Sequence, residues 1–353
     1  MSVLDLARAD IRALTPYSSA RMEARGGTVM LNANESPLAA GAGEALNRYP
    51  DPQPAALCEK LAALYGVAAA SVLVGRGSDE AIDLLLRAFC RAGRDAIAIC
   101  PPTFGMYAVA ARVQDAQVIE VPLTREFAVD IERLLSATTR NTKLVFLCTP
   151  NNPTGGLIAP TNIERIARAL AGRALVIVDE AYIEFARADS ATTLLAHHEN
   201  IAVLRTLSKA HALAGARIGT LIAAPAVIAL LRRIQAPYPL PAPCIAAALA
   251  ALETPALTQT QARVAAVLAE REAMRQSLQA LPSVREVFES AANFLCVRFA
   301  DAAATYRLLL DRGIVVRDVG SFAMLENCLR ISIGTPAENA QLLATLGAHG
   351  VSP

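Results

Sequence analysis

The sequence predicts an α/β protein, with a mostly parallel, doubly wound sheet in a large domain and a smaller α+β domain after it. Two observations support this fold class. Strand-like apolar segments alternate with helical segments from residue 55 to residue 178, which is the order of a doubly wound sheet. These strand-like segments are continuous apolar runs, such as Leu-Val-Phe-Leu at residues 144–147, and such runs are typical of parallel strands covered on both faces.

The large domain contains five predicted strands and five predicted helices. The strands are expected at residues 71–74, 95–100, 117–121, 144–148 and 174–178. The helices are expected at residues 55–65, 78–90, 103–111, 131–137 and 162–171. Ser78, Asp79 and Glu80 favour a helix that begins at residue 78, because these residue types suit a helix start.

A cluster of alternating prolines at residues 237–243 interrupts this order. After it we expect a long helix at residues 245–281 with a break near Pro255, a strand at 294–299, a helix at 305–311, and strands at 313–317 and 328–333. The chain is therefore divided into an N-terminal arm that also contributes to the small domain (residues 1–48), the large domain (49–243) and the small C-terminal domain (244–353).

The composition excludes several classes of protein. Of the 353 residues, 54% are hydrophobic and 18% are charged, which excludes a disordered chain. A net charge of +1 gives no sign of nucleic-acid binding. The longest candidate for a membrane span, residues 219–231, contains Pro225 and is shorter than the roughly 20 residues that a spanning helix needs. Since the N-terminus has no signal-like region, we expect a cytoplasmic protein.

Metal binding and disulfide bonds are not expected. The seven cysteines include no C-x-x-C pair, and the four histidines include no H-E-x-x-H motif. Reduced thiols are the default for such a chain.

Lysine is rare in this chain. The 33 Lys and Arg residues include only Lys60, Lys143 and Lys209. Mutational bias explains the scarcity, which is not itself evidence of function, but it leaves only these residues for any reaction that needs an amine. Lys60 and Lys143 fit solvated surface positions, whereas Lys209 lies between hydroxyl residues and a segment of small apolar residues.

Two glycine-containing turns follow predicted strands, at the edge where open α/β sheets bind ligands. In residues 74–80, glycines precede a helix start, so the amides of Ser78 and Asp79 can hold a phosphate. In residues 149–155, the turn sequence Asn-Pro-Thr-Gly places Asn152 at a strand end. Each segment taken alone fits an ordinary turn equally well.

Two further segments carry reactive side chains. Asp179 ends a buried strand, where a carboxylate needs a cationic partner or a metal, and Tyr182 can reach the same pocket. A helix cap would also explain Asp179, but not Tyr182. Downstream, Thr206 and Ser208 lie on one side of an extended segment beside Lys209, and an amine near cations and apolar residues has the lowered pKa that a nucleophile needs.

Two arginines complete the set of candidate residues. Arg317 and Arg330 each adjoin a strand that is predicted to be buried. The forked donors of arginine match carboxylates and phosphates. Together the segments supply an amine nucleophile, a carboxylate, a phosphate cradle and anion-binding arginines. This is the set of groups expected of an enzyme that uses pyridoxal phosphate.

The order of the motifs Gly-x-Gly-Ser-Asp, Asn-Pro-Thr-Gly, Asp-Glu-Ala-Tyr, Ser-Lys and Gly-x-Arg-x-Gly resembles that of the class I/II aminotransferases of fold type I, which depend on pyridoxal 5'-phosphate. The chain is most similar to the histidinol-phosphate branch of this family. That similarity rests on residues 14–17, 31–37, 48–50, 101–107, 206–210, 316–318 and 329–335. It implies a homodimer with shared active sites that acts on small phosphate and dicarboxylate substrates in histidine biosynthesis.

The resemblance also implies roles for the cofactor-binding residues. Lys209 would hold the cofactor as a Schiff base and move protons, and Asp179 would pair with the ring nitrogen. Asn152 and Tyr182 would bind the ring hydroxyl oxygen, and Phe104 would stack on the ring. The cofactor phosphate would be bound by Gly77, Ser78, Asp79, Thr206, Ser208 and Arg217, with Tyr49 of the partner subunit.

The substrate-binding residues implied by the resemblance are two arginines and two residues of the arm. Arg330 would bind the carboxylate of glutamate or 2-oxoglutarate, and Arg317 with Arg330 would hold the phosphate of histidinol phosphate. Tyr17 of the partner subunit and Asn34 would complete this part of the site. The implied reaction converts histidinol phosphate and 2-oxoglutarate to imidazole acetol phosphate and glutamate, with the cofactor alternating between its pyridoxal and pyridoxamine forms.

Two positions depart from the family pattern. Phe104 stands where tyrosine is common, which keeps the stacking face and loses a hydroxyl. His211 stands where phenylalanine is common, and we assign it no catalytic role.

Alternative functions remain open at this point. A phosphothreonine-type decarboxylase of the same fold would release carbon dioxide instead of forming a keto product, and an aromatic amino-acid aminotransferase would not need a second arginine. A cofactor-binding regulator would require a DNA-binding segment, and residues 1–48 show no helix-turn-helix pattern. An NAD-binding protein is disfavoured by the absence of G-x-G-x-x-G.

Overall fold

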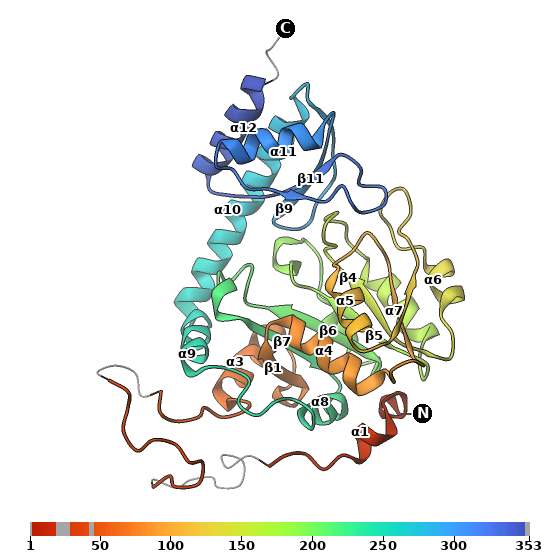
Figure 1. The fold of residues 1–353 in the computed structure, drawn as a ribbon, viewed down its shortest axis with the longest axis vertical. Helices are drawn as coiled ribbons and strands as arrows, with labels where there is room; N and C mark the ends of the chain where they lie inside the picture. Colours follow the sequence, from red (N-terminus) through yellow and green to blue (C-terminus); the bar gives the residue numbers. More distant parts are fainter. Residues whose placement is uncertain (1, 19–28, 42–45, 350–353) are drawn as a thin grey trace.

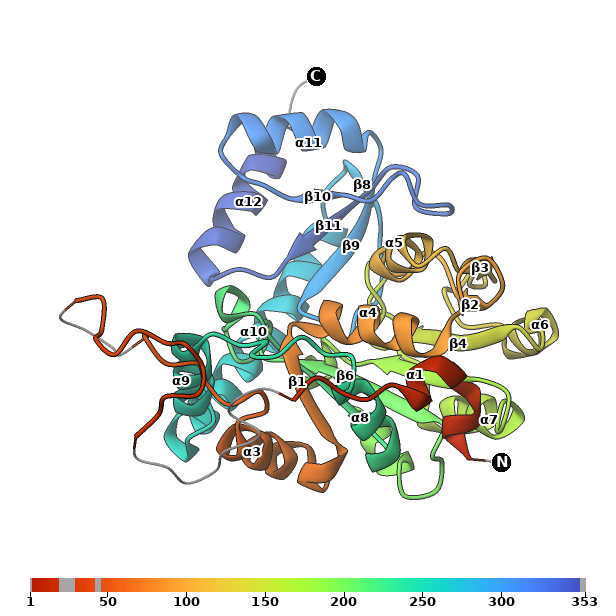
Figure 2. The same cartoon turned by 60° about the horizontal axis from the view of Figure 1, so that its bottom comes forward.

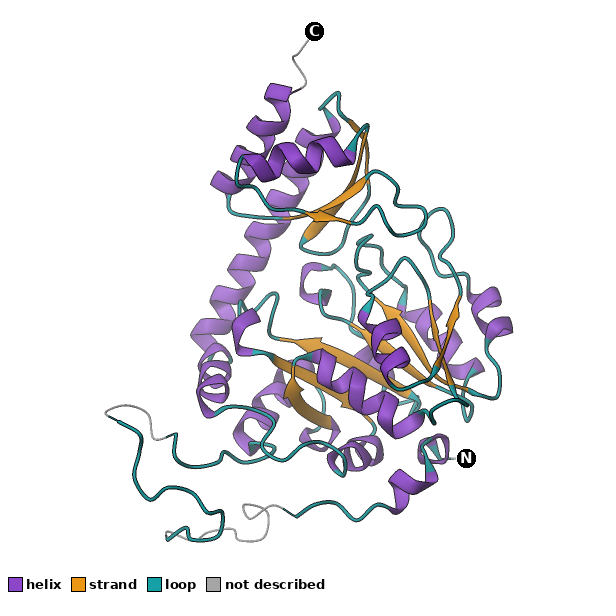
Figure 3. Cartoon of the chain, in the orientation of Figure 1, coloured by secondary structure: helices purple, strands orange, loops and turns teal. Residues whose placement is uncertain are grey.

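The computed structural model describes residues 2–18, 29–41 and 46–349 (Figure 1). It contains a seven-stranded sheet and a four-stranded sheet, and helices pack on both (Figure 3). The α/β fold class and the mostly parallel large sheet are thereby confirmed. The expected boundaries at residues 48 and 243 stay predictions.

The large sheet has the strand order β1-β7-β6-β5-β4-β2-β3. Its strands are β1 (Val72–Arg76), β2 (Ala96–Ile99), β3 (Gln117–Glu120), β4 (Thr142–Cys148), β5 (Leu175–Asp179), β6 (Ile201–Thr206) and β7 (Ile218–Ala223). Strand β7 runs antiparallel to its neighbours β1 and β6, while the pairs from β6 to β3 are parallel. The carboxyl ends of β4, β5 and β6 therefore meet at one edge of the sheet, where α/β proteins bind their ligands.

Helices cover both faces of the large sheet (Figure 2). The α4–α5 face is covered by α4 (Ser78–Phe89), α5 (Met106–Val113), α8 (Pro225–Arg232) and the N-terminal segment with α1 (Ala9–Ala13). The α3 face is covered by α3 (Ala55–Tyr65), α6 (Ile131–Ala137), α7 (Pro160–Ala169) and α9 (Ala242–Ala251). Strand side chains alternate between the two cores: in β5, Ile177 packs on the α4–α5 face and Val178 on the α3 face.

Three elements of the large layer, β6, β7 and α8, are absent from the sequence prediction. Residues 218–231 form one nearly continuous apolar run, and such a run does not reveal whether its period is that of a strand or a helix. In the structure, β7 ends at Ala223 and α8 begins at Pro225, a residue type suited to the first turn of a helix. Within the described ranges, no helix combines the length and apolar character that a membrane crossing requires.

The smaller sheet is antiparallel, in the order β10-β11-β9-β8. Its strands are β8 (Val284–Val287), β9 (Phe294–Phe299), β10 (Arg317–Asp318) and β11 (Cys328–Ser332), and α10 (Thr254–Gln279), α11 (Ala302–Asp311) and α12 (Pro336–His349) accompany them. Helices α9 and α10 are separated at residues 252–253, close to the predicted break. The predicted strand at 313–317 is wrong, because β10 consists of only two residues, both exposed. Strand β8 and helix α12 were not predicted from the sequence.

Candidate active site

A cavity of about 140 Å³ lies at the carboxyl ends of β4, β5 and β6, beside the amino-terminal end of α4. Its lining residues are Ser78, Asp79, Phe104, Cys148, Asn152, Asp179, Ala181, Tyr182, Thr206, Ser208, Lys209 and Arg217. All of these except Cys148 and Ala181 are site residues expected from the sequence. Segments from residue 78 to residue 217 are thus brought to one place by the sheet.

One part of the cavity wall is rich in hydroxyl and cationic donors. The guanidinium of Arg217 lies 3.2 Å from Asp79 Oδ2 and 3.5 Å from Ser208 Oγ. The Thr206 hydroxyl is 2.9 Å from the same Ser208 oxygen. No described side chain caps the first turn of α4, so its N–H groups can bind an anion. These donors match the three oxygens of a phosphate group.

Two glycines allow the backbone to approach this cradle closely. A Cβ at Gly77, which has a φ of 78°, would lie 2.5 Å from Nη2 of Arg217. A Cβ at Gly219 on β7 would lie 2.1 Å from the carbonyl carbon of Gly77 and 2.2 Å from the nitrogen of Ser78. Strand β7 therefore supports the cradle by direct backbone contact. Arg217 itself has a φ of 55°, a left-handed conformation that is unfavourable for non-glycine residues and tends to occur at functional sites.

Asp179 ends β5 and is only 3% exposed. Its Oδ2 accepts a hydrogen bond from the hydroxyl of Tyr107 at 2.6 Å, and its Oδ1 accepts one from the backbone N–H of Ala181 at 3.1 Å. Burial raises the pKa of Asp179 to about 6, and these two neutral donors limit the rise. The Asp179 carboxylate is therefore suited to form an ion pair with a cationic group of a ligand.

Lys209 follows β6 and its Nζ lies 5.6 Å from the centre of the Tyr182 ring. Desolvation in the cavity and the guanidiniums of Arg330 and Arg217 lower the pKa of Lys209, against the opposite effect of two pocket carboxylates. An amine with a lowered pKa is more often neutral, and only the neutral amine is a nucleophile.

The small sheet brings Arg330 of β11 to the same region. Its guanidinium contacts Oδ1 of Asn152 and lies 5.4 Å from the centre of the Phe294 ring. Phe294 in turn packs edge-on against Tyr182, with 5.2 Å between ring centres. Arg317 is directly opposite Arg330 in the β10–β11 register. The sequence predicted that Arg317 adjoins a buried strand, but both residues of β10 are exposed. Because like charges opposite each other destabilise a strand pair, an anion between these arginines would relieve a repulsion.

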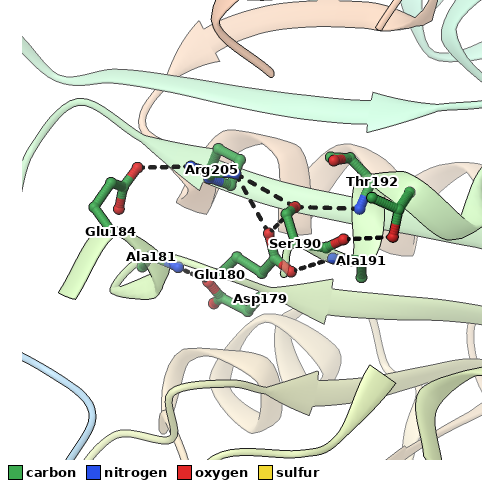
Figure 4. A network of polar contacts seen from close by, with 9 residues as sticks. Asp179, Glu180, Ala181, Glu184, Ser190, Ala191, Thr192 and Arg205 are labelled. Carbon is green, nitrogen blue, oxygen red and sulfur yellow. Dashed lines mark hydrogen bonds and ion pairs between the residues drawn. The ribbon is translucent and has the colours of Figure 1, made fainter. Parts of the chain in front are cut away.

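A buried polar network lies on the α3 face, next to the cavity (Figure 4). Arg205 of β6 contacts Glu184 at 2.8 Å and Glu180 at 3.4 Å. Glu180 also accepts hydrogen bonds from the Ser190 hydroxyl at 2.5 Å and the Ala191 N–H at 2.6 Å. Burial raises the pKa of Glu180, and Arg205 opposes this rise. The network ties the ends of β5 and β6 to the segment around residue 190.

Six predicted site residues do not line the cavity: Gly77 before α4, Arg317 and Arg330 of the small sheet, and Tyr17, Asn34 and Tyr49 of the N-terminal part of the chain. Tyr17 is 72% exposed, and Tyr49 is 50% exposed with its ring stacked on Tyr238 at 4.4 Å. Asn34 and Tyr49 instead line a second hollow of about 470 Å³. The roles expected of Tyr17 and Tyr49 concern a partner subunit, so their positions within one chain leave those roles as predictions.

The residues that support the cavity, above all Tyr107, Glu180 and Arg205, were not predicted from the sequence. Tyr107 ends the segment 101–107, and Glu180 belongs to the Asp-Glu-Ala-Tyr motif, so both lay in segments already singled out. Their contacts join residues far apart in the chain and leave no local pattern. His211 is buried, and none of the described residues hydrogen-bonds its Nδ1; it does not line the cavity.

Comparisons with known proteins found relatives that match nearly the whole chain. The family model "Aminotransferase class I and II" matches residues 22–346. A histidinol-phosphate aminotransferase of Stenotrophomonas maltophilia is 57% identical over 353 residues, which cover 98% of this chain and 97% of the relative. The crystal structure of histidinol-phosphate aminotransferase from Sinorhizobium meliloti in complex with pyridoxal-5'-phosphate has a TM-score of 0.78 at 28% identity, covering 85% of this chain and 82% of that one. L-threonine-O-3-phosphate decarboxylase from Porphyromonas gingivalis has a TM-score of 0.75 at 25% identity, covering 86% and 91%.

Proposed function

The chain belongs to the class I and II aminotransferase family, and we propose that it transfers an amino group between histidinol phosphate and 2-oxoglutarate. The products are imidazole acetol phosphate and glutamate, and the reaction is a step of histidine biosynthesis. The similarity to histidinol-phosphate aminotransferases, 57% identity in the relative above, favours this reaction over the decarboxylase, whose similarity is 25%.

The cavity fits pyridoxal 5'-phosphate, the cofactor that we propose for it. The hydroxyls of Ser78 and Ser208 with the Arg217 guanidinium suit the phosphate, and the buried carboxylate of Asp179 suits the ring nitrogen. Phe104 lines the cavity, and we propose that its ring stacks on the cofactor. When bound, this cofactor supplies an aldehyde that combines with amines and a ring that stabilises negative charge on the substrate.

Lys209 is the lysine of this cavity and carries the proton transfer in our proposal. Its amine would hold the cofactor covalently between turnovers. Because its pKa is lowered, the freed Nζ would accept a proton from the substrate carbon and return it as the amino group is transferred. Asp179 would pair with the ring nitrogen, and Tyr182 and Asn152 would bind the ring hydroxyl oxygen.

The observation that carries the substrate assignment is the facing pair Arg317 and Arg330. We propose that the phosphate of histidinol phosphate lies between these two guanidiniums, and that the carboxylate of glutamate or 2-oxoglutarate binds Arg330. A phosphate dianion matches two cations, whereas an aromatic amino acid offers only one carboxylate.

We also propose that the chain works as a homodimer. Tyr17 lies on the N-terminal arm and Tyr49 directly follows it; both side chains are exposed, and neither lines the cavity of its own chain. In the dimer, Tyr17 of the partner subunit contributes to the substrate site and Tyr49 of the partner subunit to the cofactor phosphate, as the resemblance implies.

Replacement of Arg317 tests the substrate assignment. We expect Arg317→Ala to lower kcat/KM for histidinol phosphate by roughly 10- to 100-fold, the effect of losing a charge-assisted hydrogen bond, and to leave the half-reaction with glutamate nearly unchanged. The control is Arg285→Ala, which removes an exposed arginine of β8 in the same sheet. Equal losses for both substrates would refute the phosphate role. Measuring carbon dioxide and keto product separates the aminotransferase from the decarboxylase.

A further inference from the structure

We infer that Tyr107 is a positioning residue for the proposed reaction: its hydroxyl holds the Asp179 carboxylate in place and in its charged form, and its ring supports Phe104. One buried side chain thus organises two of the groups that we expect at the cofactor ring. The inference rests on the proposed cofactor, and none of the roles implied by the resemblance includes Tyr107.

The hydroxyl of Tyr107 is placed to act on Asp179 alone among the carboxylates of the site. The side chain has 0% exposure, and its oxygen lies 2.6 Å from Asp179 Oδ2. Burial, reinforced by the Asp179 charge, raises the pKa of Tyr107 well above its usual value, so the hydroxyl keeps its proton and donates it. A hydrogen bond to the charged form of a carboxylate favours that form.

The ring of Tyr107 is held on two sides. It stacks on Phe146 of β4 with 4.7 Å between ring centres and 16° between planes. It also meets Phe104 edge-on, at 5.5 Å and 84°. Tyr107 therefore has little freedom to move its hydroxyl, and it supports Phe104 from beneath. Such fixed support is what an active-site group needs to stay in a productive orientation.

The other groups around Asp179 do not replace this contact. Asp79 on α4 raises the pKa of Asp179, while Lys209 lowers it by charge at longer range. Burial, with a smaller effect of the Asp179 charge, raises the pKa of Cys148 on β4 and of Tyr182 after β5, so both groups remain neutral. Besides Tyr107, the direct donor is the backbone N–H of Ala181. Loss of the Tyr107 hydroxyl should therefore raise the pKa of Asp179 further above about 6.

The test measures cofactor binding, not turnover. Tyr107→Phe removes the hydroxyl and keeps the ring, and the dissociation constant of pyridoxal 5'-phosphate from the apoprotein is measured by equilibrium dialysis at pH 6 and pH 8.5. A protonated Asp179 must lose its proton before it can pair with a protonated ring. We therefore expect binding that is roughly tenfold weaker than wild type at pH 6 and close to wild type at pH 8.5. Tyr306→Phe, a partly buried tyrosine of the small domain, is the matched control.

A second pair of variants shows whether Tyr107 acts through Asp179. In the Asp179→Asn background, Tyr107→Phe should change the dissociation constant less than twofold at either pH, since no carboxylate is left to stabilise. Site-specific fluorotyrosine at position 107, a stronger donor, should instead tighten binding at pH 6, and this variant serves if Tyr107→Phe fails to fold.

Three results would overturn the inference. They are equal losses at both pH values, a loss that persists in the Asp179→Asn background, or weaker binding with fluorotyrosine at pH 6. If the wild-type apoprotein binds no pyridoxal 5'-phosphate at either pH, the proposed function fails and the role of Tyr107 fails with it. If the wild type binds the cofactor and the Tyr107 variants bind it equally well at both pH values, the role of Tyr107 fails and the proposed function stands.

Discussion

Replacing Arg205 by methionine removes the cation of the buried network and leaves the carboxylates of Glu180 and Glu184 without it. Arg205 is 8% exposed and holds these carboxylates at 3.4 and 2.8 Å. Its guanidinium also lies 4.6 Å from the centre of the Tyr65 ring. Methionine fills similar space but donates nothing, so two acidic groups must remain buried with their charge uncompensated or take up protons.

The expected loss is about 3–5 kcal/mol in the free energy of unfolding, the usual result of removing one partner from a buried ion pair. An unfolding entropy of roughly 2.1 cal/mol/K per residue gives a chain of 353 residues ~0.7 kcal/mol/K in total. Near Tm, the free energy of unfolding therefore falls by that amount for each kelvin of heating. The loss therefore corresponds to a Tm lower by roughly 4–7 °C.

The pH dependence of this loss follows from the pKa of Glu180, which is already raised by burial although Arg205 opposes the rise. A carboxyl whose folded pKa exceeds its unfolded value stabilises the protein below the unfolded pKa. That contribution disappears as the pH increases through the folded pKa. Without Arg205 the folded pKa is higher still, so the deficit against wild type should be larger at pH 8 than at pH 5.

Thermal unfolding of the apoprotein at pH 5 and pH 8 measures both effects. The control is Arg168→Met, because Arg168 is a mostly exposed arginine of α7 that pairs with Glu164 at 2.8 Å, and we expect a loss below about 1 kcal/mol. Adding Glu180→Gln and Glu184→Gln to the Arg205 variant should restore most of the lost stability. A Tm loss no larger than that of the control, or a deficit that grows toward pH 5, would refute the reasoning.

Two further predictions concern the cavity itself. Gly219→Ala would place a methyl carbon 2.2 Å from the Ser78 nitrogen, so the cradle must shift. We expect cofactor binding to be at least roughly tenfold weaker, with an unchanged circular dichroism spectrum. The control is Gly347→Ala, a position where an added Cβ meets no atom within 4 Å, and this variant should bind the cofactor normally. Borohydride treatment of the protein loaded with pyridoxal 5'-phosphate should attach the cofactor to Lys209 alone, as read by peptide mass spectrometry. Attachment to Lys60 or Lys143, whose amines lie 3.1 Å from Glu253 and from the Arg140 carbonyl, would contradict the assignment.

The sequence was informative where a residue's role follows from its immediate neighbours. Asp179 could be singled out because it ends an unbroken apolar run, where an acidic residue is exceptional. Lys209 could be singled out because the chain has so few lysines and only this one lies between hydroxyl residues and a segment of small residues. The family resemblance implied that both side chains serve one cofactor, and in the structure both line one cavity.

The sequence was uninformative where a role depends on a contact across the fold. Tyr107 and Asp179 are separated by 72 positions, and no pattern within either segment indicates that they touch. The apolar run at 218–231 could not be divided into β7 and α8, since both elements are buried and show no alternation. Arg317 was expected beside a buried strand, whereas it is exposed, because β10 is a two-residue edge strand of the small sheet.

The two halves of the site, the reacting groups and the groups that support them, come from neighbouring positions in the chain. Successive strand residues point to opposite faces of a sheet. In β5 and β6, Ile177 and Leu204 pack on the α4–α5 face, so Asp179 and Thr206, two residues after each, belong to that face and reach the cavity.

Glu180, which follows Asp179, and Arg205, which precedes Thr206, turn to the α3 face and join there in the buried network. A residue that lines the cavity is therefore fixed by its own neighbour on the other side of the sheet. A single-residue slip of β6 against β5 would exchange the faces of Arg205 and Thr206, placing a guanidinium in the cavity and a threonine in the core. The ion pair between Glu180 and Arg205 opposes that slip, which is a reason for a charged network in a core that is otherwise apolar.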